Sequence, residues 1–439
     1  MVKQALENTR DRLTPKGYLS RLVDGEVESL LEIFGAVEIN GPKWCGKTWT
    51  ALNHSCSEIH LDDEAMRDLV GTDIHVALVG EKPHLIDEWQ RVPAVRDAVR
   101  RAVDESGNEA GSYLLTGSAT PAYNKVAHSG AGRIASLRMR PLSFAESGIS
   151  NASISLYGLF NGEFEEQMID TNIAQFAEAI CRGGWPASIA RPIAGALRIP
   201  RQYINTVFEV TAQRMGKDPQ IARRALVALA RNNGEAASYA TLARDMSAGE
   251  YEVNPETARN RAEEYTLFYQ HLFMIEDLPG WDAPVKSRAR VRTRPKRYLV
   301  DPSLATAALG FAPERLLGEM QMMGRLFETL CIRDIRTYLS ARPETADASL
   351  FYYRDDYGLE VDAIIELVDG RWAAIEIKLS EDKVQKGIES LLRLKNKVKE
   401  NPAAQNREPE FLAVLVGRTS IARKTPEGVY VVPVTCLTA

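Results

Sequence analysis

The first third of the chain alternates short apolar runs with segments in which apolar residues recur at helical spacing. Apolar or alternating runs of strand length lie at 36–39, 58–62, 82–88 and 112–118, whereas segments 25–34 and 92–103 repeat apolar residues every three or four positions. The first pattern predicts strands and the second predicts amphipathic helices. Strands that alternate with helices indicate a parallel sheet with its ligand at the carboxyl ends of the strands.

A glycine-rich loop follows the first predicted strand and reads Gly41-Pro42-Lys43-Trp44-Cys45-Gly46-Lys47-Thr48. The pattern G-x-x-x-x-G-K-T is typical of phosphate-binding loops, because two glycines let the backbone N–H groups turn towards phosphate oxygens. We expect Lys47 to reach the β- and γ-phosphates and the Thr48 hydroxyl to ligate Mg²⁺. Trp49 opens the helix whose N-terminus would face the phosphates. The stretch therefore predicts an ATP and Mg²⁺ site.

Two acids end the predicted strand that lies about forty residues after the loop lysine. We expect Asp87 to hold the metal ion or its waters and Glu88 to polarise the attacking water as a general base. Ser118 ends the following apolar strand, where it either contacts the γ-phosphate or its water, or forms a simple turn.

Composition matches an ordinary globular protein. The 439 residues predict about three domains, with 45% hydrophobic and 26% charged residues. The net charge of −5 does not mark the whole chain as a nucleic-acid binder, so any basic surface must be local. Five scattered cysteines favour a reducing cytosol. Neither a secretion signal nor a run of 18 apolar residues is present, so we expect a cytoplasmic protein without a membrane span.

Segment 151–215 is predicted to be mostly helical, with an interruption at 181–186. Helices follow at 220–230 and 238–246, and a third begins with Asn254 as N-cap and Pro255 at its first position. An alternating strand comes next, and this order predicts a winged helix.

Seven basic residues and no acid occupy 286–297, the predicted wing. Arg288, Arg290, Arg292 and Arg294 alternate, so an extended strand would place all four on one face. Such a row favours contact with nucleic acid, by default DNA. The alternative is an edge strand that its charge protects from aggregation.

The last part of the chain contains an acid and a Glu-x-Lys triplet on predicted neighbouring strands. Asp362 lies on one strand, and Glu376 and Lys378 share a face of the next. The pattern resembles the restriction-endonuclease-like PD-(D/E)xK arrangement, in which two carboxylates hold Mg²⁺ and the lysine orients or deprotonates the water. Glu328, on the preceding predicted helix, resembles the extra acid of some members. A domain of this kind is either an active nuclease or an inert binding or regulatory module.

The loop, the stretches Leu-Ile-Asp-Glu-Trp-Gln-Arg-Val-Pro and Leu-Leu-Thr-Gly-Ser, and Gly-Arg-Ile-Ala-Ser-Leu-Arg-Met-Arg-Pro-Leu-Ser-Phe-Ala-Glu occur in this order. Together they resemble a prokaryotic AAA-like ATPase family that carries a C-terminal domain of unknown function. The resemblance implies that Arg133 is a charge-neutralising arginine near the nucleotide, although Arg138 and Arg140 lie close by and a plain surface arginine is the alternative.

These observations predict an α/β fold. A P-loop NTPase domain of the AAA-like class is expected at 17–150, a helical linker region at 151–217, a winged-helix-like domain at 218–312 and a nuclease-like α/β domain at 318–439. One hypothesis is an ATP-hydrolysing enzyme that acts on DNA, with cleavage gated by the nucleotide. The other is a nucleotide-driven switch that binds DNA or a protein partner and cuts nothing. A homo-oligomer is compatible with both.

Overall fold

The computed structural model describes residues 12–119, 132–247, 254–281, 294–402, 404 and 406–439. The chain divides into two compact units. The first comprises residues 1–140, 271–273 and 341–343, and the second comprises 141–270, 274–340 and 344–439. Three of the four arginines of the predicted wing, Arg288, Arg290 and Arg292, lie outside the described residues.

The first unit is built on a parallel sheet of five strands in the order β2-β3-β4-β1-β5. This order places β4 between the strand that leads into the glycine-rich loop and the strand that ends in the acid pair. The strands are β1 (Ala36–Asn40), β2 (Ser57–His60), β3 (His84–Asp87), β4 (Tyr113–Gly117) and β5 (Ile134–Arg138). The helices are α1 (Asp24–Ile33), α2 (Lys47–Asn53), α3 (Glu64–Thr72), α4 (Ala94–Glu105) and the short turns η1 (Ile74–Leu78) and η2 (Trp89–Arg91).

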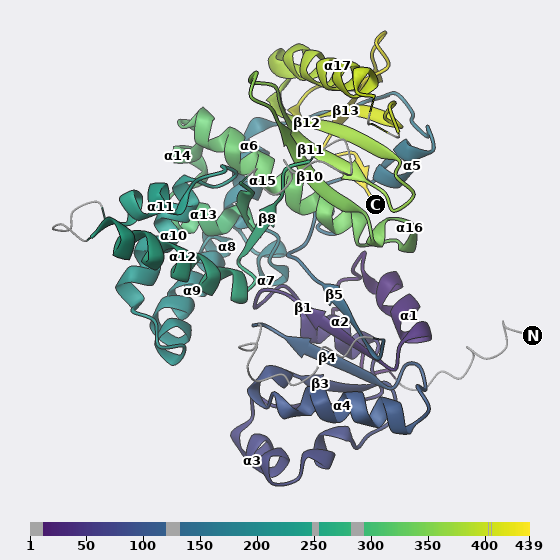
Figure 1. Ribbon diagram of the computed structural model, residues 1–439, viewed down its shortest axis with the longest axis vertical. Helices are drawn as coiled ribbons and strands as arrows, with labels where there is room; N and C mark the ends of the chain where they lie inside the picture. The colour runs from purple at the N-terminus through teal and green to yellow at the C-terminus, as the bar shows by residue number, and fades with distance from the viewer. Residues whose placement is uncertain (1–11, 120–131, 248–253, 282–293, 403, 405) are drawn as a thin grey trace, which may run out of the picture. The chain divides into compact units, whose positions relative to one another are not determined.

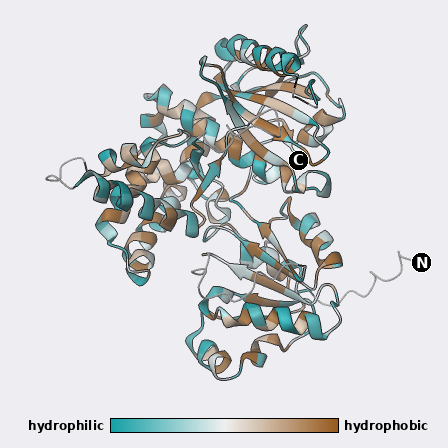
Figure 2. Ribbon diagram, in the orientation of Figure 1, coloured by the Kyte–Doolittle hydropathy of each residue, from teal (hydrophilic) through white to brown (hydrophobic). Residues whose placement is uncertain are grey.

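Two inner strands of this sheet, β3 and β4, are buried along their whole length, which explains their apolar runs. Every residue of β3 and β4 is buried, because helices pack on the sheet. Val95, Val99 and Val103 repeat at four-residue spacing along α4 and join Ile86 and Leu115 in one core cluster. Figure 2 shows the hydrophobic residues gathered along the strands. The strands and helices predicted for this part of the chain are confirmed.

The second unit begins with segments that join the C-terminal strands rather than a purely helical region. β6 (Ile154–Ser155) pairs with β16 (Leu437–Thr438), and β7 (Gln167–Met168) pairs with β14 (Ile421–Lys424). The expectation of a mostly helical 151–215 is therefore right only from Ile173 onward. The helices of this region are α5 (Leu156–Phe160), α6 (Ile173–Arg182), α7 (Pro186–Ile189), α8 (Ile193–Ala196), α9 (Arg198–Thr206) and the π-helical η4 (Val207–Ala212).

Three helices and an antiparallel strand pair follow, in the predicted order. They are α10 (Pro219–Arg231), α11 (Tyr239–Met246), α12 (Pro255–His271), β8 (Ile275–Leu278) and β9 (Lys296–Leu299). The Asn254 side chain accepts a hydrogen bond from the Glu256 N–H at 2.9 Å, which confirms the predicted cap. Two further helices, α13 (Pro302–Leu309) and α14 (Pro313–Leu317), complete the region. The winged-helix assignment itself stays a prediction.

The C-terminal region is a mixed sheet in the order β10-β11-β12-β13-β15-β14-β7. Figure 1 shows α17 and α15 on opposite faces of it, and both pack against β12. The remaining elements are α15 (Met320–Leu339), α16 (Pro343–Ala346), β10 (Ser349–Arg354), β11 (Glu360–Glu366), β12 (Trp372–Ser380), η6 (Glu381–Lys383), α17 (Val384–Glu400), β13 (Phe411–Arg418) and β15 (Tyr430–Pro433). The strands and helices predicted around Asp362 and Glu376 are confirmed, whereas a nuclease-like fold stays a prediction.

The glycine pair that interrupts the helices at 183–184 serves packing. A Cβ on Gly184 would lie 2.1 Å from the Leu142 carbonyl oxygen, so no larger residue fits there. The Gly184 N–H donates to Asp301, whose carboxylate also accepts from the Arg333 guanidinium at 2.7 Å. Arg333 and Asp301 are almost fully buried, so the pair satisfies charges that would otherwise be costly.

Candidate functional site

The glycine-rich loop joins the carboxyl end of β1 to α2. Gly46 has φ of 107°, and a Cβ on Gly41 would lie 2.2 Å from the Met139 carbonyl oxygen, so both positions require glycine. Trp44 also has a positive φ, 66°, and its side chain is exposed. The Lys47 side chain is buried inside the loop, where its ammonium donates to the Pro42 carbonyl at 2.8 Å. The lysine therefore lies where the loop encloses it.

A buried arginine, Arg21, holds the loop backbone through hydrogen bonds. Arg21 is 6% exposed, and its guanidinium donates to the carbonyl oxygens of Cys45 and Arg140 at 2.8 Å each. The Gly41 N–H donates to the Gly117 carbonyl at 3.3 Å, which ties the start of the loop to the end of β4. These contacts fix the loop backbone, because each joins it to a different segment of the unit.

Asp87 lies beside Thr48 at the carboxyl edge of the sheet. The Thr48 hydroxyl donates to the Asp87 Oδ1 atom at 3.0 Å, and the Thr116 hydroxyl donates to the same atom. His60 Nδ1 lies 3.2 Å from the other carboxylate oxygen. Burial opposes the charged form of His60, but its hydrogen bonds to Asp87 and Glu58 outweigh burial and raise its pKa.

Glu88 follows directly and adopts left-handed backbone angles, φ 54° and ψ 42°. Such angles are unfavourable for a residue with a Cβ and are typical of functional sites. Its Oε2 atom accepts hydrogen bonds from Gln90 Nε2 at 2.6 Å and from the Ser118 hydroxyl at 3.0 Å. The structure therefore brings together Glu88 and Ser118, which the sequence placed on two different predicted strands.

The donor set at this edge fits Mg²⁺. Thr48 offers a hydroxyl oxygen and Asp87 a carboxylate, and Mg²⁺ prefers such hard oxygen ligands with waters and substrate phosphates completing the shell. Lys47, Thr48, Asp87, Glu88 and Ser118 belong to one site in the first unit.

Arg133 lies elsewhere. Its carbonyl accepts from the Ala36 N–H at the start of β1, whereas the loop begins after the end of that strand. Arg133 lies level with residue 35, because Ile134 pairs with Ala36. The loop begins six residues later, at Gly41, and six residues of a strand span about 20 Å at about 3.3 Å per residue. The Arg133 guanidinium pairs with Asp104 at 2.7 Å. Arg133 therefore does not lie beside the loop of its own chain, and its role as a charge-neutralising arginine near a nucleotide stays a prediction. Arg138 pairs in register with Asn40, at the loop end of the sheet.

In the second unit, the structure brings Asp362, Glu376 and Lys378 together. Lys378 Nζ lies 3.3 Å from Asp362 Oδ2 and also contacts Glu376. The Ile377 N–H donates to the same Asp362 oxygen at 2.8 Å. Glu328 of α15 does not contact Glu376; it accepts from Lys296 Nζ at 3.2 Å. The predicted metal ligands thus have ammonium groups as partners.

Burial and neighbouring charges set the protonation of this cluster. Burial, with the Asp362 charge, raises the pKa of Glu376 well above its usual range. Burial opposes ionisation of Asp362 too, but Lys378 and Lys296 outweigh it and lower its pKa. Burial alone would lower the pKa of Lys378, yet Asp362 and Glu376 raise it. The two acids thus favour the charged form of Lys378.

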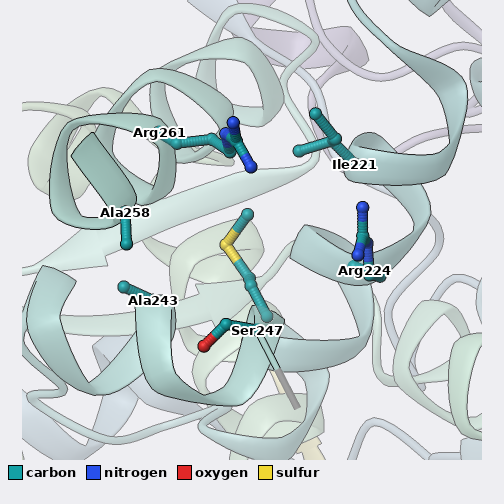
Figure 3. Close-up of a pocket in the computed structure, with 7 residues that line it drawn as sticks. Ile221, Arg224, Ala243, Ser247, Ala258 and Arg261 are labelled. Carbon is teal, nitrogen blue, oxygen red and sulfur yellow. The ribbon is translucent and has the colours of Figure 1, made fainter. Parts of the chain in front are cut away.

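A small cavity lies between α10, α11 and α12 (Figure 3). Its volume is about 20 Å³, room for about one water molecule, and no phosphate-loop residue lines it. Arg224 and Arg261 lie at its rim. Arg294, the one described arginine of the predicted wing row, is exposed.

Several partners in both sites were missed from the sequence. His60, Gln90 and Thr116 contact the acid pair. Lys296 contacts Glu328 and Asp362, and Glu360 contacts Lys296. Thr116 lies near the end of β4, the strand that follows β3 in the sequence, and this position could have indicated its contact with Asp87. Nothing in the spacing of Lys296 indicates its partners.

Three family models match separate parts of the chain. Residues 34–148 match one described as an AAA domain. Residues 173–315 match a domain of unknown function, DUF8612, and residues 323–437 match another, DUF4143. The first match and the loop geometry together support a P-loop ATPase domain of AAA type. No curated protein matches the chain.

Solved structures with some similarity include a Walker-type ATPase of Pyrococcus abyssi, at 10% identity and a TM-score of 0.40, over 68% of this chain and 98% of that one. The Aeropyrum pernix ORC1 protein in complex with DNA aligns at 13% identity and 0.28, over 73% and 97%. A RuvB variant of Thermotoga maritima aligns at 16% identity and 0.27, over 63% and 90%. Similarities this low carry no argument about function. No helix within the described ranges is both long and apolar enough to cross a bilayer.

Proposed function

We propose that the chain binds ATP with Mg²⁺ at the loop 41–48 and hydrolyses it. One observation carries the proposal: the Thr48 hydroxyl and the Asp87 carboxylate meet at 3.0 Å beside a loop that encloses the Lys47 ammonium. A metal-binding pair and a phosphate-binding lysine at one sheet edge are the parts that phosphoryl transfer needs.

Each residue of this site has a separate role in the proposed reaction. Loop N–H groups and Lys47 bind the phosphates, and Thr48 with Asp87 would hold Mg²⁺, which neutralises charge on the transferred phosphoryl group. Glu88 accepts a proton from the attacking water, and Ser118 and Gln90 orient its carboxylate through their hydrogen bonds. Thr116 and His60 hold Asp87 in place.

Isothermal titration calorimetry with Mg²⁺ and ATP tests the binding half of this proposal. We expect saturable binding by the wild-type protein and a higher melting temperature, because ligand at 100 times its dissociation constant adds about 2.7 kcal/mol. A wild-type protein that shows no ATP binding would overturn the central assignment.

We further propose that the chain acts on DNA through the row of four alternating arginines at 288–294. The support is the sequence itself, in which Arg288, Arg290, Arg292 and Arg294 alternate without an intervening acid. Affinity for duplex DNA should fall with salt at a log–log slope of about −0.9 per phosphate neutralised. Replacing all four arginines by Ser should flatten the slope, and replacing all four by Lys is the charge-matched control. If the Ser variant binds DNA as tightly as the wild type, the row serves only to protect an edge strand from aggregation.

We propose that the C-terminal domain is catalytically inert and that the protein is a nucleotide-driven switch that cuts nothing. Lys378 contacts both Asp362 and Glu376, and no group of three His, Cys, Asp or Glu side chains in the described parts of the chain is arranged to hold a metal ion. Plasmid incubated with the protein and Mg²⁺ or Mn²⁺ should stay intact. Nicking that a chelator stops and that Asp362→Asn abolishes would restore the nuclease hypothesis.

A further inference from the structure

Lys296 is a buried lysine at the start of β9, and its ammonium faces three carboxylates. Its Nζ atom lies 2.7 Å from Glu360 Oε1, 3.2 Å from Glu328 Oε1 and 4.0 Å from Asp362 Oδ1. Only 6% of its side chain is exposed. A lysine is rarely buried to this degree unless its charge is paired. The three acids come from α15 and β11, so one ammonium joins three segments of the second unit.

The other polar atoms around this ammonium also have partners. Tyr298, two residues along β9, donates its hydroxyl to Glu328 Oε1 at 2.6 Å. Asp362 Oδ2 accepts from the Ile377 N–H and from Lys378, which leaves Oδ1 to face Lys296. The acids therefore form one network that contacts two ammonium groups, those of Lys296 and Lys378.

A divalent metal ion does not fit this arrangement. Mg²⁺ and Ca²⁺ bind carboxylate oxygens at about 2.0 to 2.6 Å, so an ion must lie between the acids it joins. An ion between Asp362 and Glu376 would meet the Lys378 ammonium, and an ion between Asp362 and Glu328 would meet Lys296. The donor set that resembles a nuclease site is thus already compensated by the protein's own cations.

We propose that the Lys296 ammonium is the resident cation of this acid cluster, and that it excludes a divalent metal ion for as long as β9 stays in place. Carboxylates removed from water need a counter-charge, which either a metal or an ammonium can supply. In this chain the counter-charge comes from the segment that matches DUF8612, whereas all three acids lie in the segment that matches DUF4143.

The contact therefore fastens β9 to the C-terminal sheet and makes metal access depend on the position of β9. Moving β9 away would leave Glu328, Glu360 and Asp362 facing one another without the lysine. Without the ammonium, the negative charge that these carboxylates share would attract a hard cation in its place. The inference does not depend on ATP hydrolysis, because every residue in it belongs to the second unit.

Manganese binding by the full-length protein tests this assignment. In nucleotide-free protein, Lys296→Met should bind Mn²⁺ at least tenfold more tightly than the wild type in calorimetry, and Mn²⁺ should raise its melting temperature. Lys386→Met, an exposed lysine of α17, is the matched control and should behave as the wild type. Lys296→Arg keeps the cation and should gain nothing. Adding Asp362→Asn to Lys296→Met should abolish the gain, which separates this site from the phosphate loop.

Two results would overturn the proposal. One is Mn²⁺ binding by the wild type that Asp362→Asn removes, because the lysine would then not exclude the metal. The other is a folded Lys296→Met protein that gains no Mn²⁺ affinity. If Lys296→Met does not fold, Lys296→Met with Glu328→Gln removes one negative charge together with the lysine and leaves Glu360 and Asp362 as ligands. For this double variant, the same two results would overturn the proposal.

Discussion

Replacing Glu88 by glutamine removes the proposed general base with little change in shape. The amide keeps an oxygen that can accept the hydrogen bonds from Gln90 and Ser118, which now end on Oε2 at 2.6 and 3.0 Å. The left-handed backbone at this position does not depend on the side-chain charge. The variant should therefore fold, bind Mg²⁺ and ATP, and fail in the step that needs a proton acceptor.

The expected loss follows from what a positioned base contributes. General-base catalysis is worth about 10² to 10⁴ in rate, which is about 2.7 to 5.4 kcal/mol of barrier at 1.36 kcal/mol for each tenfold change. The effect on stability should be far smaller. Two hydrogen bonds to a charged acceptor become two to a neutral one, a change of about 1 kcal/mol or less in the free energy of unfolding for each bond.

Phosphate release under saturating Mg²⁺ and ATP measures the rate, and melting curves with and without nucleotide measure binding. We expect turnover to fall by at least a hundredfold while ATP still raises the melting temperature. Glu105→Gln, an exposed residue at the end of α4, is the matched control and should leave both readings unchanged. Turnover within threefold of the wild type in Glu88→Gln would refute the assignment of the base, even if ATP binding were intact.

Three further predictions follow from the first unit. Lys47→Ala should abolish calorimetric ATP binding, and an unchanged dissociation constant would contradict the role of the loop. Arg133→Ala should leave turnover at low protein concentration unchanged, because the guanidinium pairs with Asp104 at the far end of β1; a loss of activity seen only at high concentration would indicate action on a neighbouring copy. Burial, with the Lys82 charge, lowers the pKa of His84 to about 4. Its native state stays neutral while the unfolded chain takes a proton below pH 6.5, so urea melts should show stability lost from pH 6.5 towards 4, by about 1 to 2 kcal/mol after allowance for screening. His84→Gln should remove that part of the slope.

The elements of the first unit were predictable because their signals are local. The loop needs glycine at fixed positions, its strand directly precedes it and its helix begins at its end. Apolar spacing along α4 reflects which face one helix buries. For the same reason the Asn254 cap was predicted correctly, since its hydrogen bond joins residues two positions apart. The acid pair was noticed because Asp87 and Glu88 stand at the end of a predicted strand, and its catalytic role stays a prediction.

The position of Arg133 shows what spacing in the sequence leaves undetermined. Its place shortly before a strand says nothing about which end of the sheet that strand's first residue occupies. Only the parallel register of β1 and β5 decides that, and it sets Ile134 level with Ala36, away from the loop. Segment 151–170 was predicted as helix because β6 and β7 are two residues long and carry almost no pattern of their own. Their pairing with β16 and β14 makes them strands.

The sequence by itself determined the glycine-rich loop and the order of strands and helices in the first unit, and it predicts the residue types that could hold Mg²⁺. The tertiary structure decided which groups compensate the acids. Lys296 and Asp362 are 66 positions apart, and no propensity or spacing links them. Electrostatic pairing depends on distance in space and on burial. Here the carboxylates of Glu328, Glu360 and Asp362 form an ion network because β9 places the Lys296 ammonium among them.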